Sequence, residues 1–482
     1  MNFQALVNFL NDKKVALEVA DDQLKVHAAK GCITQGVANA ITEHKAQLLE
    51  HVKSSTMQNQ MIRVTKEEKA SGVPLSFAQQ RLWFINKLKG SNTSYHVQGG
   101  FKLVGPLNVE ALTHAFKTVI ERHESLRTVF IERDGEPLQV VKESFNFALN
   151  IKEMASSKSE INGELLDEAT KPFNLTEDLM LRVLLIKQSE NESLLLFTIH
   201  HIATDGWSVS VMLQELNSLY RAYNNNQINP LPELAFQYVD FANWQRNSIK
   251  VEALDKQQAY WKDAMADAPE VHSLPLDYPR PSRLSQDGAL YQHSLNGKLT
   301  TAIKDLCQSQ QCTLFMLLQG AFALLLNRWS NEKDIVMGTP VANRTQAEFF
   351  PLIGFFVNTL VLRTKLTGNP SFIEYIQQVK VNLLDAYANQ DVPFDTLVEI
   401  LNPARSESLT PLFQIMFSLQ NNQIPDFDFD GLTFTPLTEN MRIAKFDITL
   451  NIEDKGGRLN CDWEYNPKLF SSSTIGALAS AF

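Results

Sequence analysis

Two adjacent histidines followed by an aspartate and a glycine are the residues of this sequence best suited to chemistry. His200 and His201 end the apolar run 194–199, and Asp205 and Gly206 follow after three residues. Because side chains alternate along a strand, one imidazole should face the core and the other a cleft. A neutral imidazole at a cleft can accept a proton from an attacking amine or hydroxyl. The missing side chain of Gly206 would let a substrate approach the backbone closely.

Three other interpretations of the same segment are considered. A buried histidine pair with an aspartate also fits a satisfied polar cluster without a catalytic role. Metal binding is disfavoured, because adjacent strand residues face apart and no further ligand cluster lies nearby, so we predict no metal. Serine hydrolysis is disfavoured because the run Gly206–Ser210 lacks the second glycine of a nucleophile elbow. The sequence has no glycine-rich phosphate loop, which argues against ATP chemistry.

Alternating strands and helices, beginning near Pro74, are expected to hold these residues. Strands are predicted over 181–187 and 194–200, before a helix over 208–223. Asp134-Gly135 predicts a hairpin turn between strands. The second half of the chain is predicted to contain a strand near Tyr291, a helix over 314–329, a strand over 334–338, and strands near 411–419 and 447–452.

Length and composition exclude several classes of protein. The chain has 482 residues, 44% of them hydrophobic and 20% charged, which is typical of a globular protein. Its net charge of -10 argues against nucleic-acid binding. The longest apolar run, Leu314–Leu326, is shorter than the ~18–20 residues of a membrane-spanning helix. The N-terminus lacks the charge order of a secretory signal, and the four cysteines form no CxxC pair, so we expect a cytoplasmic protein.

The first 55 residues form a separate small unit in the pattern of the sequence. β-Prone runs over 15–19 and 24–27 flank Asp21-Asp22 and predict a hairpin, with amphipathic helices on either side. The segment 54–72 is polar and aperiodic, which is typical of a linker. We therefore expect four parts. They are a small domain (1–55), a linker (56–73), an N-lobe (74–250) and a C-lobe (251–482).

A series of motifs in a fixed order resembles the condensation domains of nonribosomal peptide synthetases. The histidine segment, HHIATDG, matches the HHxxxDG core of that family, and the resemblance covers residues 74–482. The matching segments are Leu75–Phe84 (LSFAQQRLWF), Arg122–Phe130 (RHESLRTVF), His200–Gly206 (HHIATDG), Tyr238–Trp244 (YVDFANW), Ile353–Arg363 (IGFFVNTLVLR) and Asn389–Asp395 (NQDVPFD). The last motif of the family is degenerate in Arg405–Leu412, and we expect the natural protein to continue beyond Phe482.

This resemblance implies an α/β fold of two chloramphenicol-acetyltransferase-like lobes in a V-shaped pseudo-dimer. It also implies that His201 faces the cleft, as general base or as an orienting group, and that the Gly206 N–H binds the developing oxyanion. His200 and Asp205 would support the site, with Arg344 pairing with Asp205. The remaining implied residues are Arg81 and Trp83 for structural support and Trp207, Ser208 and Asn358 along the substrate tunnel. The run 352–360 is similar to the subtype that accepts an L-configured donor.

The N-terminal unit is similar to the β-hairpin docking domains that begin some synthetase subunits, of the tubulysin-synthetase type. Such a domain would bind, through strand addition, the C-terminal tail of an upstream subunit. The expected docking residues are Leu17, Val19, Leu24, Lys25, Val26 and Lys30. The two lysines could meet acidic residues on that tail, or they could be ordinary solvated lysines.

The resemblance implies amide formation between two carrier-bound thioesters. The amine of a downstream aminoacyl thioester would attack the carbonyl of an upstream peptidyl or aminoacyl thioester. No cofactor would belong to the chain, because the phosphopantetheine arms belong to upstream and downstream carrier proteins, and an adenylation domain would follow in the full-length protein. The alternatives are a noncatalytic recruitment module and a stand-alone acyltransferase that uses a soluble acyl thioester. Neither nucleic acid nor a membrane is an expected partner.

Overall fold

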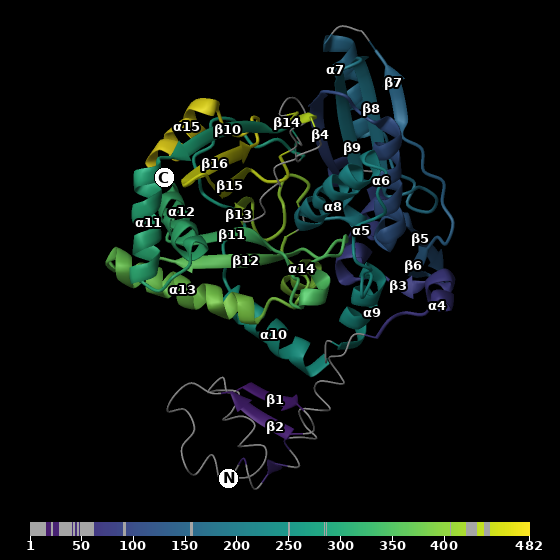
Figure 1. Cartoon of the computed structure of the whole chain (residues 1–482). Coiled ribbons are helices and arrows are strands. Elements are labelled where there is room, and N and C mark those ends of the chain that lie inside the picture. The colour runs from purple at the N-terminus through teal and green to yellow at the C-terminus, as the bar shows by residue number, and fades with distance from the viewer. Residues whose placement is uncertain are drawn as a thin grey trace. The chain divides into compact units, whose positions relative to one another are not determined.

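The computed structural model of the chain contains two compact units, and each is described separately (Figure 1). One unit comprises residues 1–63 and 244–248, and the other comprises residues 64–243 and 249–482. The structure describes residues 16–20, 23–27, 41, 44–45, 48, 62–89, 93–154, 158–248, 251–283, 285, 287–404, 406–420, 431–437 and 444–482.

The N-terminal unit contains a two-stranded antiparallel hairpin. β1 (Ala16–Ala20) pairs with β2 (Gln23–His27), and two residues connect them. The register places Leu17 opposite Val26 and Val19 opposite Leu24, with Lys25 opposite Glu18. The hairpin predicted from the sequence is therefore confirmed; its first strand is shifted by one residue, and its second strand begins one residue earlier than predicted. Lys30 lies outside the described residues.

The N-lobe is built around a five-stranded sheet with the order β14-β4-β9-β8-β7. Its strands are β4 (His96–Val104), β7 (Asn150–Glu153), β8 (Leu181–Ser189), β9 (Glu192–His200) and β14 (Thr433–Pro436). Helices cover both faces of this sheet, so β8 and β9 contain the continuous buried stretches 183–186 and 193–200. α6 (Val109–Arg122) and α8 (Gly206–Asn224) pack on one face, and α7 (Lys158–Thr170) packs on the other. The predicted strands 181–187 and 194–200 are confirmed.

A smaller three-stranded sheet, with the order β3-β6-β5, lies beside this core. Its strands are β3 (Val73–Pro74), β5 (Thr128–Arg133) and β6 (Glu136–Val141), and the neighbouring helices are α4 (Lys66–Ser71), α5 (Phe77–Lys89), α9 (Tyr238–Ser248), η1 (Thr93–Tyr95) and η2 (Glu124–Arg127). Asp134 and Gly135 connect β5 and β6 with φ angles of 54° and 84°. Two positive φ angles are typical of the tight turn that the Asp-Gly pair predicts.

The expected linker 56–73 ends earlier than its composition suggests. α4 occupies residues 66–71 and begins at a capping box, in which Thr65 and Glu68 bond each other's backbone N–H groups. The N–H of Val64 donates to Asp240 Oδ1 at 2.7 Å, and the compact unit begins at Val64. The Thr-x-x-Glu pattern predicts the start of this helix, whereas the polar composition of the segment indicates only a linker.

The C-lobe contains a six-stranded sheet with the order β10-β16-β15-β13-β11-β12. Its strands are β10 (Ala289–Leu295), β11 (Asp334–Val341), β12 (Asn358–Lys365), β13 (Ile415–Gln420), β15 (Ile448–Lys455) and β16 (Arg458–Tyr465). Its helices are α10 (Val251–Ala264), α11 (Gly297–Ser309), α12 (Leu314–Ser330), α13 (Phe372–Ala388), α14 (Phe394–Leu401), α15 (Ser472–Ala481) and the short η4 (Ala347–Phe349). One core joins sheet and helices, and the fully buried Phe322 of α12 lies within it. The helix and strand predicted over 314–338 are confirmed.

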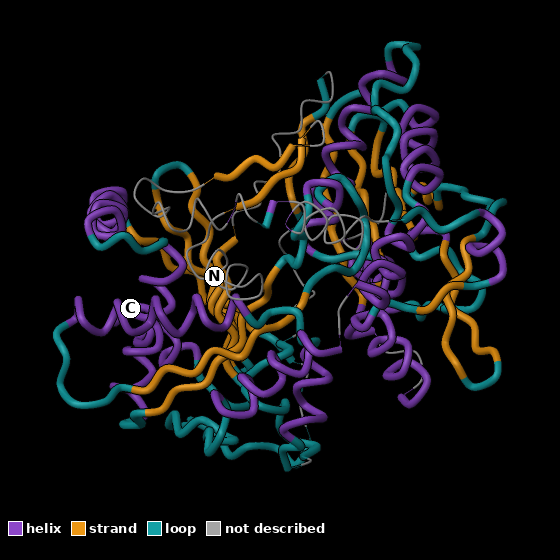
Figure 2. Tube along the Cα trace, turned by 90° about the horizontal axis from the view of Figure 1, so that it is seen from below, coloured by secondary structure: helices purple, strands orange, loops and turns teal. Residues whose placement is uncertain are grey.

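A short strand from the second half of the chain completes the N-lobe sheet. β14 runs antiparallel to β4, with Phe434 opposite Leu103 and Pro436 opposite Phe101 (Figure 1). Leu432, just before β14, belongs to the N-lobe core. The lobe boundary expected at residue 250 therefore does not fully separate the two lobes, because β14 lies after it in sequence but belongs to the N-lobe sheet. Figure 2 shows the strands of both lobes from below.

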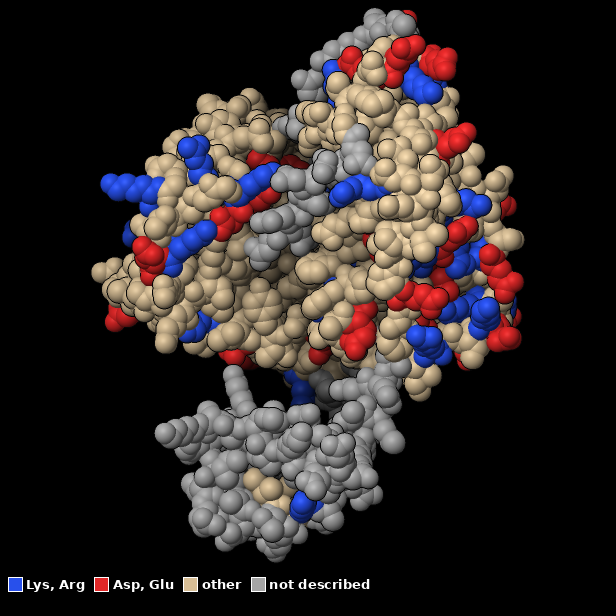
Figure 3. Space-filling view, viewed as in Figure 1, with Lys and Arg blue, Asp and Glu red and all other residues tan. Residues whose placement is uncertain are grey.

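The described surface and helices add two observations. In the view of Figure 3, lysine and arginine side chains lie among aspartates and glutamates, so both signs of charge are mixed on that face. Among the described helices, none alone is long and apolar enough to cross a membrane. α11 and α12 meet that criterion only as a pair bent by 108°.

Candidate active site

The histidine segment lies where β9 ends and α8 begins. His200 is the last residue of β9, and His201 starts the single turn η3 (His201–Ala203). His200 is 2% exposed, whereas His201 is half-buried. The two imidazoles thus occupy different environments, although the chain turns at His201 and does not continue as a strand.

The imidazole of His201 has a fixed tautomer. Its Nδ1 lies 2.8 Å from the carbonyl oxygen of Thr204, and a carbonyl can only accept, so Nδ1 carries the proton. Nε2 is then left with a free lone pair. Burial lowers the pKa of His201 to about 4, and the positive charge of Lys445 acts in the same direction. His201 is therefore neutral near pH 7, and its Nε2 can accept a hydrogen bond or a proton.

His200 has a structural role in the same turn. Its Nδ1 accepts a hydrogen bond from the N–H of Ile202 at 3.1 Å and so caps η3. Its ring packs edge-on against His96 and Phe173. Burial lowers the pKa of His200 to about 3, with the neighbouring His96 as the next cause. His200 therefore remains uncharged in the folded protein.

This buried histidine predicts a loss of stability in acid. The unfolded chain protonates His200 below its ordinary pKa of 6.5, but the folded chain protonates it only near pH 3. Its stability contribution is therefore complete above pH 6.5 and is lost as the pH falls toward 3. As the pH falls from 7 to 5, we expect this residue to lower the free energy of unfolding by about 2 kcal/mol.

Urea unfolding at the two pH values measures this loss. The variant His200→Asn keeps an oxygen that can cap the turn but has no titrating ring. Between pH 7 and pH 5, the free energy of unfolding of this variant should decrease by about 2 kcal/mol less than that of the natural chain. Equal losses in both proteins would contradict the assignment.

Asp205 is held by hydrogen bonds from two lobes. Its Oδ1 accepts from the N–H of Ser208 at 2.8 Å and caps α8, and its Oδ2 accepts from the N–H of Phe356 at 3.0 Å. Arg344 Nη2 lies 3.3 Å from Asp205 Oδ1. Because Asp205 is 3% exposed and both oxygens are occupied, its chemistry is structural. It fixes the start of α8 next to His201.

Arg344 joins this cluster to the segment 349–356, which connects the lobes. One guanidinium nitrogen donates to the carbonyls of Phe349 and Leu352, and the other donates to Ser208 Oγ at 2.8 Å. The guanidinium also lies 3.9 Å from the ring centroid of Phe356. Arg344 comes from the segment after β11, so the residue pair implied by the resemblance is brought together across the lobe junction.

The backbone of segment 349–356 is bound by side chains of the N-lobe. Ser125 Oγ donates to the carbonyl of Ile353 at 2.7 Å, and His123 Nδ1 accepts from its N–H at 3.3 Å. His123 Nε2 in turn donates to Glu215 at 2.7 Å. Tyr238 donates to the carbonyl of Phe355 at 2.6 Å. The junction of the lobes is therefore a hydrogen-bonded unit and not a loose apolar contact.

Gly354 in this segment predicts a sensitive site. A Cβ atom there would lie 1.9 Å from Cδ2 of the buried Tyr238 ring, closer than atoms can approach. Gly354→Ala should lower the unfolding free energy by about 1–3 kcal/mol, because the ring or segment 349–356 must shift. The matched control is Gly163→Ala on α7, where a Cβ meets nothing within 4 Å. Urea unfolding of both variants tests this; a Gly354→Ala variant as stable as the control would contradict it.

Two of the implied tunnel residues make several hydrogen bonds within the protein. Ser208 is fully buried, and its Oγ accepts from Gly354 N at 3.1 Å and donates to Gly354 O at 2.8 Å. The hydroxyl of Ser208 therefore holds segment 349–356 against the start of α8. Asn358 donates to the carbonyls of Gln390 and Val392 at 2.9 Å, and its oxygen accepts from Phe394 N at 3.1 Å. It anchors the loop 389–394.

The other implied residues lie closer to the cleft. Trp207 is half-buried in the first turn of α8 and donates to the carbonyl of Phe350 at 3.0 Å. Gly206 is exposed, and a Cβ there would meet nothing within 4 Å, so open space adjoins its backbone. Arg81 on α5 forms an ion pair with Asp395 of α14 at 3.0 Å, and Trp83 lies on the same helix. Two motifs far apart in sequence therefore meet between the lobes.

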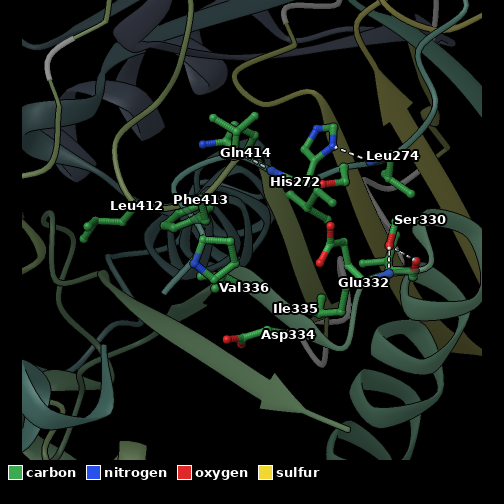
Figure 4. A pocket seen from close by; sticks show the side chains of 15 residues that line it. His272, Leu274, Ser330, Glu332, Asp334, Ile335, Val336, Leu412, Phe413 and Gln414 are labelled. Carbon is green, nitrogen blue, oxygen red and sulfur yellow. Dashed lines mark hydrogen bonds between the residues drawn. The ribbon is translucent and has the colours of Figure 1, made fainter. Parts of the chain in front are cut away.

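A pocket of about 390 Å³ lies elsewhere, in the C-lobe (Figure 4). None of its lining residues is a site residue expected from the sequence; they include His272, Leu326, Asp334, Phe413 and Gln414. Within the described part of the chain, no group of three His, Cys, Asp or Glu residues could hold a metal ion.

Sequence reasoning missed Lys445 and Tyr95. Lys445 influences the pKa of His201, and its Nζ lies 6.0 Å from the ring centroid of Tyr95. Both residues are isolated in sequence from the histidine segment. No spacing pattern connects them to it, so only the fold could reveal them.

Comparisons with known proteins agree with this geometry. The family model for the condensation domain matches residues 69–482, and the model for the TubC N-terminal docking domain matches residues 4–53. One of the linear gramicidin synthase chains of Brevibacillus parabrevis is 40% identical over 430 residues, which are 88% of this chain and 8% of that protein. Bacitracin synthase 3 of Bacillus licheniformis is 35% identical over 428 residues, which are 89% of this chain and 7% of that protein. The chain thus spans less than a tenth of either relative.

Two solved structures share the fold. The X-domain from teicoplanin biosynthesis superposes with a TM-score of 0.76 at 24% identity, covering 87% of this chain and 95% of that one. The EpoB cyclization-docking bidomain of Sorangium cellulosum superposes with a TM-score of 0.75 at 18% identity, covering 100% and 97%. With both family models matched, the chain belongs to the condensation-domain family of nonribosomal peptide synthetases and carries a TubC-type docking domain.

Proposed function

We propose that this chain joins two carrier-bound thioesters through an amide bond. The observation that carries the proposal is the lone pair of His201 Nε2, left free by the bond from Nδ1 to Thr204. Open space adjoins the backbone of Gly206, five residues further along the chain. A noncatalytic domain would not need a neutral, half-buried histidine at this position. The Asp205–Arg344 cluster supports this geometry from the other lobe.

In the proposed reaction, the acceptor amine attacks the carbonyl carbon of the donor thioester. His201 Nε2 accepts a hydrogen bond from an amine N–H and aligns the nitrogen lone pair with the carbonyl. The N–H of Gly206 donates to the developing oxyanion. The C–S bond then breaks, and a proton from the amine ends on the thiol of the donor arm. The phosphopantetheine arms are parts of the substrates and not residents of this chain.

A single-turnover experiment tests this proposal. Donor and acceptor carrier proteins are loaded separately with aminoacyl-phosphopantetheine, mixed with the chain, and weighed by intact mass spectrometry. We expect the acceptor carrier to gain the donor acyl group and the donor carrier to lose it. Use of a soluble acyl-CoA in place of the donor carrier at equal rate would favour a stand-alone acyltransferase. Acyl transfer at the uncatalysed rate would favour a recruitment module.

Partners and donor stereochemistry belong to the same proposal. We infer that the β1–β2 hairpin takes up the C-terminal tail of an upstream subunit through strand addition, since both edges of a two-stranded hairpin can take a further strand. The run 352–360 leads us to infer an L-configured donor, and the cysteine usage leads us to infer the cytoplasm. A downstream carrier and an adenylation domain would complete the assembly.

Deleting residues 1–55 separates docking from chemistry. We expect weaker use of the native upstream carrier and little change with a donor carrier fused to the chain. Equal use of the native carrier with and without these residues would refute the docking role. Paired L- and D-aminoacyl donors test the stereochemical inference in the same assay.

A further inference from the structure

The loop before β15 holds one lysine between anchored neighbours. Ala444 is 2% exposed, and the ring of Phe446 stacks on Phe413 at 5.2 Å. Asp447 is 1% exposed and is bound by Arg280 through both oxygens, at 3.1 and 2.5 Å. Lys445 is exposed although the residues around it are fixed. The neighbours of Lys445 therefore fix its backbone, and its side chain extends to the ring of Tyr95 in the N-lobe.

A histidine reinforces this anchor. His272 Nδ1 accepts from the N–H of Leu274 at 3.2 Å, so Nε2 carries the proton that it donates to Asp447 at 2.9 Å. Although burial opposes ionisation, the hydrogen bonds from His272 and Arg280 hold the pKa of Asp447 below its usual range. Asp447 thus remains a fixed anion two residues from Lys445.

The side chain of Lys445 reaches the N-lobe beside the two histidines. Its Nζ lies 6.0 Å from the ring centroid of Tyr95, which directly precedes β4. The first residue of β4, His96, lies opposite His200 in the sheet register. Tyr95 also packs on the cluster that contains Ile202. A cation at Tyr95 is therefore next to the strand end that carries His201.

Charged and titratable groups from several elements surround this site. The groups are His96 of β4 and Arg182 of β8 near His200, Asp205 near His201, and Arg81 of α5 and Glu464 of β16 near Lys445. The charge of Asp205 is taken up by Arg344 and two backbone N–H groups. Burial lowers the pKa of Lys445, whereas the charge of Glu464 acts in the opposite direction and favours the ammonium form. The charge that acts on His201 from the C-lobe is that of Lys445, which is positive.

We propose that Lys445 is a positioning residue of the condensation site, whose cation keeps both His201 and the incoming acceptor amine unprotonated. The inference rests on the proposed function. An α-ammonium ion has a pKa of about 7.7–8.0 in water, so a large fraction is unreactive near pH 7. A nearby cation disfavours this charged form and releases its proton to solvent before attack. The free amine then attacks as described above, and its remaining surplus proton ends on the thiol.

The pH dependence of the single-turnover rate tests Lys445. In Lys445→Met we expect the acidic limb of the pH–rate profile to move to higher pH by about 0.5–1 unit. The variant lacks the positive charge that disfavours protonation of the acceptor amine. Below the limb this shift is a loss of about 3–10-fold, while the rate at alkaline pH stays within about twofold. Lys445→Arg retains the charge and should retain the position of the limb.

Two outcomes would overturn the inference. The first is a limb that does not move in Lys445→Met; the second is an equal loss at every pH, which would mean direct contact with reacting atoms. The matched control is Lys455→Met, an exposed lysine at the C-terminal end of β15, the strand that follows Lys445, and it should leave the profile unchanged.

A second measurement separates this inference from the proposed function. NMR titration of ¹³C-histidine in the full chain, with His201 assigned by His201→Ala, reports its pKa without any substrate. We expect a higher pKa of His201 in Lys445→Met, and an unchanged value would overturn the inference. If the natural chain forms no amide at any pH, the proposed function fails, whereas this titration still gives its own answer.

Discussion

Replacing His201 by alanine is expected to lower the single-turnover rate of amide formation by about 10²–10⁴-fold while the protein remains folded. The variant removes the Nε2 lone pair and with it the group that aligns the amine. The structural losses are the hydrogen bond to Thr204, worth about 1 kcal/mol, and the packing of the imidazole on the ring of Phe355 at 4.8 Å. The acyl mass transferred between carriers measures the rate, and thermal unfolding checks the fold.

The control for this prediction is His293→Ala. His293 lies on β10 in the C-lobe, away from the histidine segment, and should keep the natural rate. A His201→Ala variant with less than a twofold loss would show that positioning by other groups suffices. The assigned role of His201 would then be wrong.

Asp205→Ala is expected to lower the free energy of unfolding by ~3–5 kcal/mol, which is the second large effect. The substitution removes the cap of α8 and the acceptor for Phe356 N, and it leaves Arg344 buried without its counter-ion. Because this one carboxylate joins both lobes to the histidine turn, activity should fall together with stability. Urea unfolding at pH 7 measures the change.

A comparison with Asp287→Ala controls for the loss of an aspartate. Asp287 pairs with Lys468 at 3.7 Å with both side chains about 60% exposed, so its loss should be nearly neutral. The double variant Asp205→Ala/Arg344→Met should be less destabilised than the sum of its single variants, since it leaves no lone buried charge. An unchanged melting temperature of Asp205→Ala would contradict this account of the junction.

The sequence predicts those parts of the site that depend on a single strand, helix or turn. β8 and β9 contain the apolar runs 183–186 and 194–197, so the two strands and the position of His200 at a strand end could be predicted, although β8 ends two residues later and β9 begins two residues earlier than predicted. Asp134-Gly135 predicts its hairpin because few residue pairs adopt two positive φ angles. The N-cap role of Asp205 likewise belongs to local chemistry, as an aspartate just before a helix.

Contacts between distant segments could not be predicted in the same way. β14 is four residues long and pairs with β4 more than 300 residues away, and four residues are too few for periodicity to identify a strand. Ser208 and Asn358 are polar residues near a cleft in sequence terms. Only the fold shows that segment 349–356 and the loop 389–394 occupy their hydrogen-bonding groups. The electrostatic influence of Lys445 on His201 from the other lobe could not be predicted for the same reason.

The intact mass of the acceptor carrier protein, after one turnover with the natural chain and with His201→Ala, tests the central claim most directly. The account predicts that the natural chain adds the mass of the donor acyl group to the acceptor, and that the variant adds almost none in the same time. An acceptor carrier whose mass stays unchanged with the natural chain, or rises equally with both proteins, would contradict it.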